Sequence, residues 1–181
     1  MFAWERRRGS ARVRLGPAMK NAAFRLVRGI GIAIHNATNP NKEEWDAYLA
    51  MSDATLRAGG DLSRFKQLVF TDGGGPNAAQ RKAALDLGRP FGSWSDVKVA
   101  VVSSSMGVRG IVTAFNWLGA SLRSFSPSQL DDAFAYLGVS PDAALAICDA
   151  VDALSASVSG TVRSTAGVSD SKRELARRAA R

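Results

Sequence analysis

Two loops of this 181-residue chain carry residue types that could bind a ligand. The first loop consists of Thr71, Asp72, Gly73, Gly74, Gly75, Pro76 and Asn77. The second consists of Ser103, Ser104 and Ser105, with Arg109 shortly after it. Consecutive glycines before a helix can turn backbone N–H groups toward an anion, helped by the helix dipole. The hydroxyls and Arg109 would add contacts, so these loops predict, as one alternative, a site for a small anionic ligand or nucleotide.

The glycine loop departs from the known phosphate-binding patterns. Lys82 lies too far along the following helical stretch to act as a P-loop lysine, and no G-x-G-x-x-G pattern occurs. Asp72 also places a negative charge where a phosphate would approach. The sequence therefore favours a tight, solvent-facing turn that needs glycine backbone geometry, with ligand binding as the alternative.

The candidates for catalysis and metal binding are few. His35 is the one histidine, and no G-x-S-x-G elbow supplies a nucleophile for it, so we interpret it as a strand-end residue. Cys148 is the one cysteine and falls in an apolar-patterned segment, where a buried, inert thiol is expected. One histidine and one distant cysteine give no metal-ligand cluster. We expect no enzymatic activity, no cofactor and no metal.

Trp117 is the aromatic residue for which the sequence leaves two interpretations open. The apolar stripe of its expected helix leaves Trp117 off the main apolar face. An exposed tryptophan beside Arg109 or Asn116 would suit a surface that binds a partner protein. Packing on a neighbouring helix is the more common place for a tryptophan.

Short apolar runs alternate with helical patterns along the chain, and these elements must position the two loops. Strand patterns are expected at residues 24–34 (turning at Arg28-Gly29), 67–71, 97–102 and 122–125. Helical patterns follow Asn39-Pro40, span residues 78–87 and 108–118, and begin again at Ser126-Pro127 and Ser140-Pro141. This alternation predicts an α/β fold with a mixed, mostly parallel sheet of four to five strands and flanking helices. Both loops then follow strands, at the sheet edge where ligands of open sheets bind.

The net charge of +8 lies at the two ends of the chain. Residues 1–20 carry six basic and one acidic side chain, and residues 160–181 carry six basic and two acidic ones. We expect residues 1–20 and 156–181 to be flexible basic tails around a domain spanning 21–155. Nucleic-acid binding through these tails is a further alternative, beside a purely solubilising role. With no apolar run of membrane-spanning length and no secretory signal, a soluble, cytoplasmic protein is expected.

Four segments together resemble a known family. They are EEWDAYL (43–49), LVFTDGGGPNAAQRKAAL (68–85), VKVAVVSSSMGVRGIVTAF (97–115) and SPSQLDDAFAYLG (126–138). Over about residues 22–139 the chain resembles the STAS-like domains related to anti-sigma-factor antagonists and SEC14-type proteins. That resemblance implies a non-enzymatic regulatory module that binds a partner protein, often a kinase-like anti-sigma factor, with a homo-oligomer also open.

The resemblance also implies a switch that this sequence lacks. Many members are phosphorylated on a serine at the start of the helix after a central strand. Here Asp72-Gly73-Gly74-Gly75 stand in place of a D-S-S-G-like motif, and Thr71 is the nearest hydroxyl. Partner binding would then be constitutive or would respond to another input.

Overall fold

The computed structural model describes residues 20–59, 61–105, 107 and 121–179.

A two-stranded hairpin begins the sheet. Strands β1 (Ala22–Val27) and β2 (Ile30–His35) pair antiparallel. Arg28 (φ 51°) and Gly29 (φ 78°) form the loop between them, and two positive φ values in a two-residue loop match the twist of a hairpin. The predicted turn at Arg28-Gly29 is confirmed.

Three parallel strands complete the sheet. They are β3 (Lys66–Thr71), β4 (Lys98–Val102) and β5 (Ser121–Phe125). The five strands lie in the order β1-β2-β3-β4-β5, and all pairs beyond the hairpin are parallel. The predicted α/β fold with a mixed, mostly parallel sheet is therefore confirmed, with five strands. The carboxyl ends of β2, β3 and β4 lie at one edge of this sheet.

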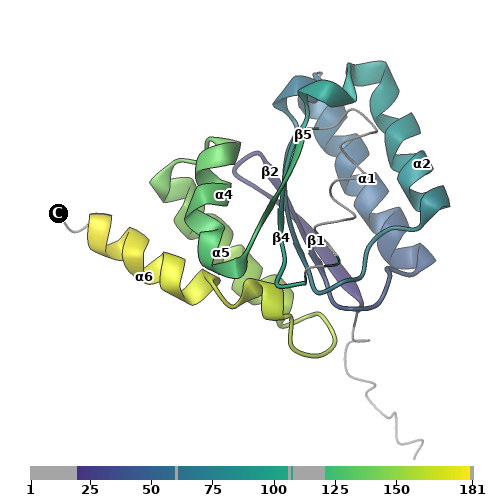
Figure 1. Cartoon of the computed structure of the whole chain (residues 1–181). Coiled ribbons are helices and arrows are strands. Elements are labelled where there is room, and N and C mark those ends of the chain that lie inside the picture. Colours follow the sequence, from purple (N-terminus) through teal and green to yellow (C-terminus); the bar gives the residue numbers. More distant parts are fainter. Residues whose placement is uncertain (1–19, 60, 106, 108–120, 180–181) are drawn as a thin grey trace, which may run out of the picture.

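Two helices cover one face of the sheet (Figure 1). They are α1 (Lys42–Gly59) and α2 (Ala78–Gly88), and α2 packs mainly against α1. The side chain of Asn41 accepts from the Glu44 N–H (2.9 Å), and Glu44 accepts from the Asn41 N–H (2.8 Å). This reciprocal pair caps α1 at Asn41. The Asn39 side chain, two residues earlier, instead accepts from the Gly75 N–H (3.2 Å).

The opposite face carries the larger core. Helices α4 (Leu130–Leu137) and α5 (Pro141–Ser155) pack on it, so the molecule has three layers (Figure 1). A capping box between Ser126 and Gln129 precedes α4 near the start predicted at Ser126-Pro127, and Gly138 (φ 64°) ends that helix. Alternate strand residues face these helices. The largest fully buried ones are Ile32, Ile34, Leu68, Phe70 and Val102.

The C-terminal segment folds, in contrast to the flexible tail that its composition predicts. Helix α6 (Val168–Ala179) packs on α5, and Figure 1 shows it as the outermost element on that side. Val168, Ser171 and Leu175 are buried and lie three or four positions apart, so they form one stripe along the helix. Because the stripe is narrow, the average hydropathy of the segment stays low and does not reveal it. Residues 1–19 lie outside the described residues, and Lys20 forms a bridge with Val158.

Short single turns of 3-10 helix lie in several of the connections between these elements. They span Leu62–Arg64, Arg89–Phe91, Trp94–Asp96, Pro127–Gln129 (η4) and Arg163–Thr165 (η5). The helix expected at residues 108–118 falls outside the described residues. In the part that the structure describes, every helix is too short or too polar to cross a membrane.

Candidate functional site

A cavity of about 500 Å³ lies between the sheet and helices α1 and α2. It reaches the carboxyl ends of β2 and β3, where sequence reasoning placed a ligand site. Its volume is that of a small-molecule site, which is roughly 300–1,000 Å³. Its wall is mainly aromatic and aliphatic, with side chains that include Phe24, Trp45, Tyr48, Val69, Leu85, Trp94, Val99, Val101 and Leu122.

Three aromatic rings pack together at one side of the cavity. The ring centroids lie 4.6 Å apart for Trp45 and Tyr48, 5.0 Å for Phe24 and Tyr48, and 6.5 Å for Phe24 and Trp45. The Trp45 indole N–H donates to the Gln80 carbonyl (3.1 Å), which ties this cluster to α2. Rings held at such distances in non-parallel orientations form a stable, preformed apolar surface.

His35 is the polar residue that sequence reasoning undervalued. It ends β2 as predicted, but its ring also lines the cavity, packs edge-to-face on Phe24 (5.5 Å) and is only 4% exposed. Its Nδ1 is buried and finds no hydrogen-bond partner within the part of the chain that the structure describes. Burial lowers the pKa of His35 from 6.5 to about 4, against a smaller opposing effect of Glu44, so the imidazole is neutral at neutral pH.

Unfolding experiments against pH test the burial of His35. The unfolded chain binds a proton at His35 near pH 6.5, whereas the folded chain does so only near pH 4. Stability is therefore highest above pH 6.5 and falls as the pH drops toward 4, by roughly 3 kcal/mol from this residue. In denaturant titrations from pH 7 to pH 4, His35→Phe should lose less stability than the wild type. Identical profiles would contradict the assignment.

The glycine loop lines the cavity but uses its donors internally. The N–H of Gly73 donates to Thr71 Oγ1 (3.0 Å), that of Gly74 to the Asn36 carbonyl (2.9 Å), and that of Gly75 to Asn39 Oδ1 (3.2 Å). The anionic-ligand alternative relied on these N–H groups. With acceptors already in place, they do not form an anion cradle.

Asp72 has a structural partner that its neighbours in sequence do not reveal. Its carboxylate accepts from the backbone N–H groups of Arg163 (2.6 Å) and Ser164 (2.8 Å). These contacts hold the turn η5 against the end of β3, so Asp72 joins the C-terminal segment to the sheet. Charged acceptors make such hydrogen bonds about twice as strong as neutral ones.

The other predicted site residues do not gather in one place. Asn77 lines the apolar cavity and caps α2, accepting from the Gln80 N–H (2.9 Å). Ser103 is buried, and its hydroxyl accepts from the Ser105 N–H (3.1 Å). Ser104 and Ser105 line a separate, polar cavity of about 490 Å³, together with Asp72 and Arg163. Arg109 and Trp117, the predicted partner-binding residues, lie outside the described residues.

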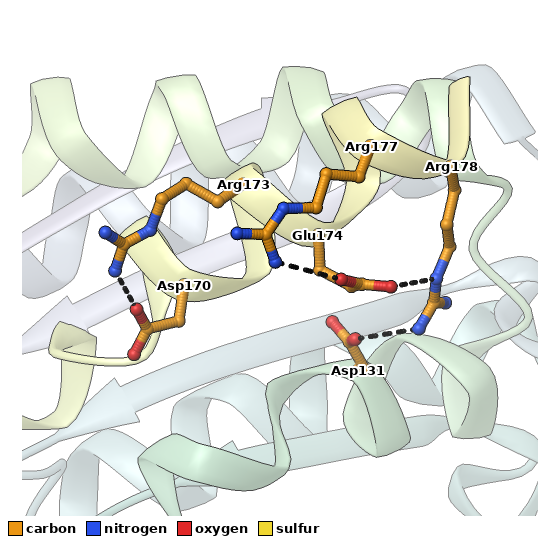
Figure 2. Close-up of polar contacts among 6 residues, drawn as sticks. All are labelled: Asp131, Asp170, Arg173, Glu174, Arg177 and Arg178. Atoms are coloured by element: carbon orange, nitrogen blue, oxygen red, sulfur yellow. Dashed lines mark hydrogen bonds and ion pairs between the residues drawn. The ribbon is translucent and has the colours of Figure 1, made fainter. Parts of the chain in front are cut away.

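The basic residues of α6 lie among carboxylates (Figure 2). Arg173 pairs with Asp170, and Arg177 with Glu174 (3.6 Å). Arg178 reaches both Glu174 (3.0 Å) and Asp131 on α4 (3.8 Å). Exposed pairs of this kind stabilise little, and the mixture of signs gives α6 no uninterrupted basic stripe. Helix α6 therefore has no uniformly basic surface that would support the nucleic-acid alternative.

Cys148 is buried on α5, and burial raises its pKa to about 12. A thiol with so high a pKa is a poor nucleophile at neutral pH. Among the described residues, no three or more His, Cys, Asp and Glu side chains are grouped to hold a metal ion.

The fold and the cavity together define a three-layer α/β domain with an apolar cavity between its sheet and helices α1 and α2 that reaches the carboxyl ends of β2 and β3. In comparisons with known proteins, no family model, no curated protein and no solved structure matches this chain.

Proposed function

We propose that this chain is a non-enzymatic regulatory domain that binds a small, mainly apolar molecule in the cavity between the sheet and helices α1 and α2. The observation that carries the proposal is the cavity itself, about 500 Å³ with an aromatic and aliphatic wall. Apolar chambers with a few polar groups are the usual form of small-molecule sites.

The paired state of the polar groups in the described wall favours an uncharged ligand. Arg81 is the charged side chain among them, and its guanidinium donates to the Pro76 carbonyl (2.7 Å). The indole N–H groups of Trp45 and Trp94 already donate to carbonyls of α2, and the N–H groups of the glycine loop have acceptors. A buried charge without a partner costs several kcal/mol or changes its protonation state. A neutral molecule with a large apolar surface avoids that cost and gains from burial.

The regulatory part of the proposal is supported by the resemblance of residues 22–139 to STAS-like domains. Such modules act by binding a partner protein, so a ligand in the chamber would take the place of the missing phosphoserine as the input. Trp117 is the candidate contact for that partner. A pull-down from the native cell with Trp117→Ala should lose the partner, and equal recovery with both proteins would count against this role.

Ligand binding is tested by a matched pair of alanine substitutions on α2. Ala84 lines the cavity, whereas Ala79 is exposed on the same helix. We expect uncharged aromatic probes to raise the free energy of unfolding of the wild type, by about 2.7 kcal/mol at a hundredfold excess over Kd. Ala84→Leu fills part of the chamber and should weaken probe binding at least tenfold, measured by thermal shift and calorimetry.

Ala79→Leu is the control, because it adds the same side chain to the same helix outside the chamber. It should bind the probes as the wild type does. Equal weakening by both variants would show that the probes bind elsewhere. A panel of uncharged aromatic probes that leaves the wild type unstabilised would overturn the proposal, and stabilisation only by nucleotides or phosphorylated metabolites would favour the anionic alternative.

A further inference from the structure

His35 lines the apolar cavity, and its buried Nδ1 has no hydrogen-bond partner among the described residues. Four buried side-chain polar atoms in the described part of the chain lack hydrogen bonds: His35 Nδ1, Ser52 Oγ, Asp86 Oδ1 and Ser164 Oγ. Of the four residues, His35 alone lines the apolar cavity. Leaving a polar group buried and unpaired costs free energy, so such a group calls for an explanation.

Three neighbouring polar groups in the described part of the wall are engaged with partners other than His35. The Tyr48 hydroxyl donates to Gln67 Oε1 (3.3 Å), and the Thr71 hydroxyl donates to the Gly74 carbonyl (2.6 Å). The Trp94 indole N–H donates to the Leu85 carbonyl (3.1 Å). A molecule that fills the cavity lies against the imidazole ring and is a source of a hydrogen bond for it.

The chemistry of His35 defines what that molecule must offer. A neutral imidazole has one nitrogen that donates and one that accepts. A hydroxyl can pair with either nitrogen, because it both donates and accepts, whereas an N–H group pairs with the accepting nitrogen. The rings of Phe24, Trp45 and Tyr48 in the same wall suit a flat apolar body.

We infer that the ligand of this cavity is an uncharged, planar, mainly apolar molecule with one hydroxyl or N–H group that pairs with His35. Phenols, naphthols and indoles belong to this class. The inference rests on the proposed function, because it assigns the polar contact of the same cavity. His35 is thereby the residue that determines specificity, while the aromatic wall supplies most of the affinity.

Two probes of equal shape test the contact. 2-Naphthol and 2-methylnaphthalene differ by a hydroxyl in place of a methyl group. Their Kd values should be measured by calorimetry at pH 7 with the wild type, His35→Phe and His35→Gln. We expect the preference for 2-naphthol over 2-methylnaphthalene to fall at least tenfold from the wild type to His35→Phe, equivalent to about 1.4 kcal/mol. His35→Gln, which keeps a hydrogen-bonding group, should retain part of the preference.

The outcomes separate this inference from the proposed function. If both probes bind the wild type and His35→Phe with the same relative preference, the His35 contact is wrong while the ligand-binding function stands. If no probe binds the wild type, the proposed function fails as well. Circular dichroism and thermal unfolding establish that each variant is folded, and His35→Gln provides the comparison if His35→Phe is not.

Discussion

Gly74→Ala should lower the free energy of unfolding by about 3 kcal/mol or more, the upper range for steric overpacking. A Cβ at this position would lie 2.2 Å from the Thr38 carbonyl oxygen and 2.6 Å from the Asn36 carbonyl oxygen. Both atoms belong to backbone, so neither can move aside as a flexible side chain would. Urea denaturation of the purified variant measures the loss, and probe binding should fall with it because the loop lines the cavity.

Gly75→Ala is the matched control for this prediction. A Cβ on Gly75 meets no atom within 4 Å, and its neighbour in sequence is the sensitive position. The control should remain within about 1 kcal/mol of the wild type. If Gly74→Ala is as stable as Gly75→Ala, the loop does not approach residues 36–38 as the structure has it.

Gly167→Ala is expected to have a comparable effect at the other end of the chain. A Cβ on Gly167 would lie 1.8 Å from the Pro127 carbonyl oxygen, where the chain before α6 passes η4. Relief of that overlap requires α6 to move away from α4 and α5. We expect a loss of about 3 kcal/mol in the free energy of unfolding and faster cleavage of the C-terminal segment by trypsin.

Gly59→Ala serves as the comparison, since a Cβ there meets nothing within 4 Å at the end of α1. Wild-type stability and unchanged proteolysis of Gly167→Ala would mean that residues 156–179 do not pack on the domain. That result would restore the flexible tail that the composition predicts.

Local signals account for the parts of the fold that the sequence predicts well. Alternating apolar residues and a turn with two positive φ values are properties of adjacent residues, so the hairpin could be located at Arg28-Gly29. The capping box at Ser126 likewise involves residues three positions apart. Such patterns depend on backbone geometry within one turn of chain and need no knowledge of the tertiary structure.

The candidate site is less predictable because its contacts join distant residues. The partners of Asp72 lie 91 and 92 residues further along the chain, so the sequence shows only a carboxylate beside glycines. His35 looked like a strand-end residue, and its place in a cavity wall depends on how Phe24 and α1 pack around it. The alternation of residues along β2 gives one indication that His35 lies near Phe24. His35 is on the same face of β2 as Ala33, which pairs with Phe24.

The order of the strands also bears on how this protein is made. Because spatial order follows chain order, each strand leaving the ribosome finds its neighbour already present. The face that carries Ile32, Ile34, Leu68 and Phe70 is different, because the described helices that cover it, α4 and α5, begin at Leu130. At about 5–20 residues per second, α4 and α5 follow the strands of this face by several seconds. Apolar surface that is exposed in this way during synthesis favours aggregation in general.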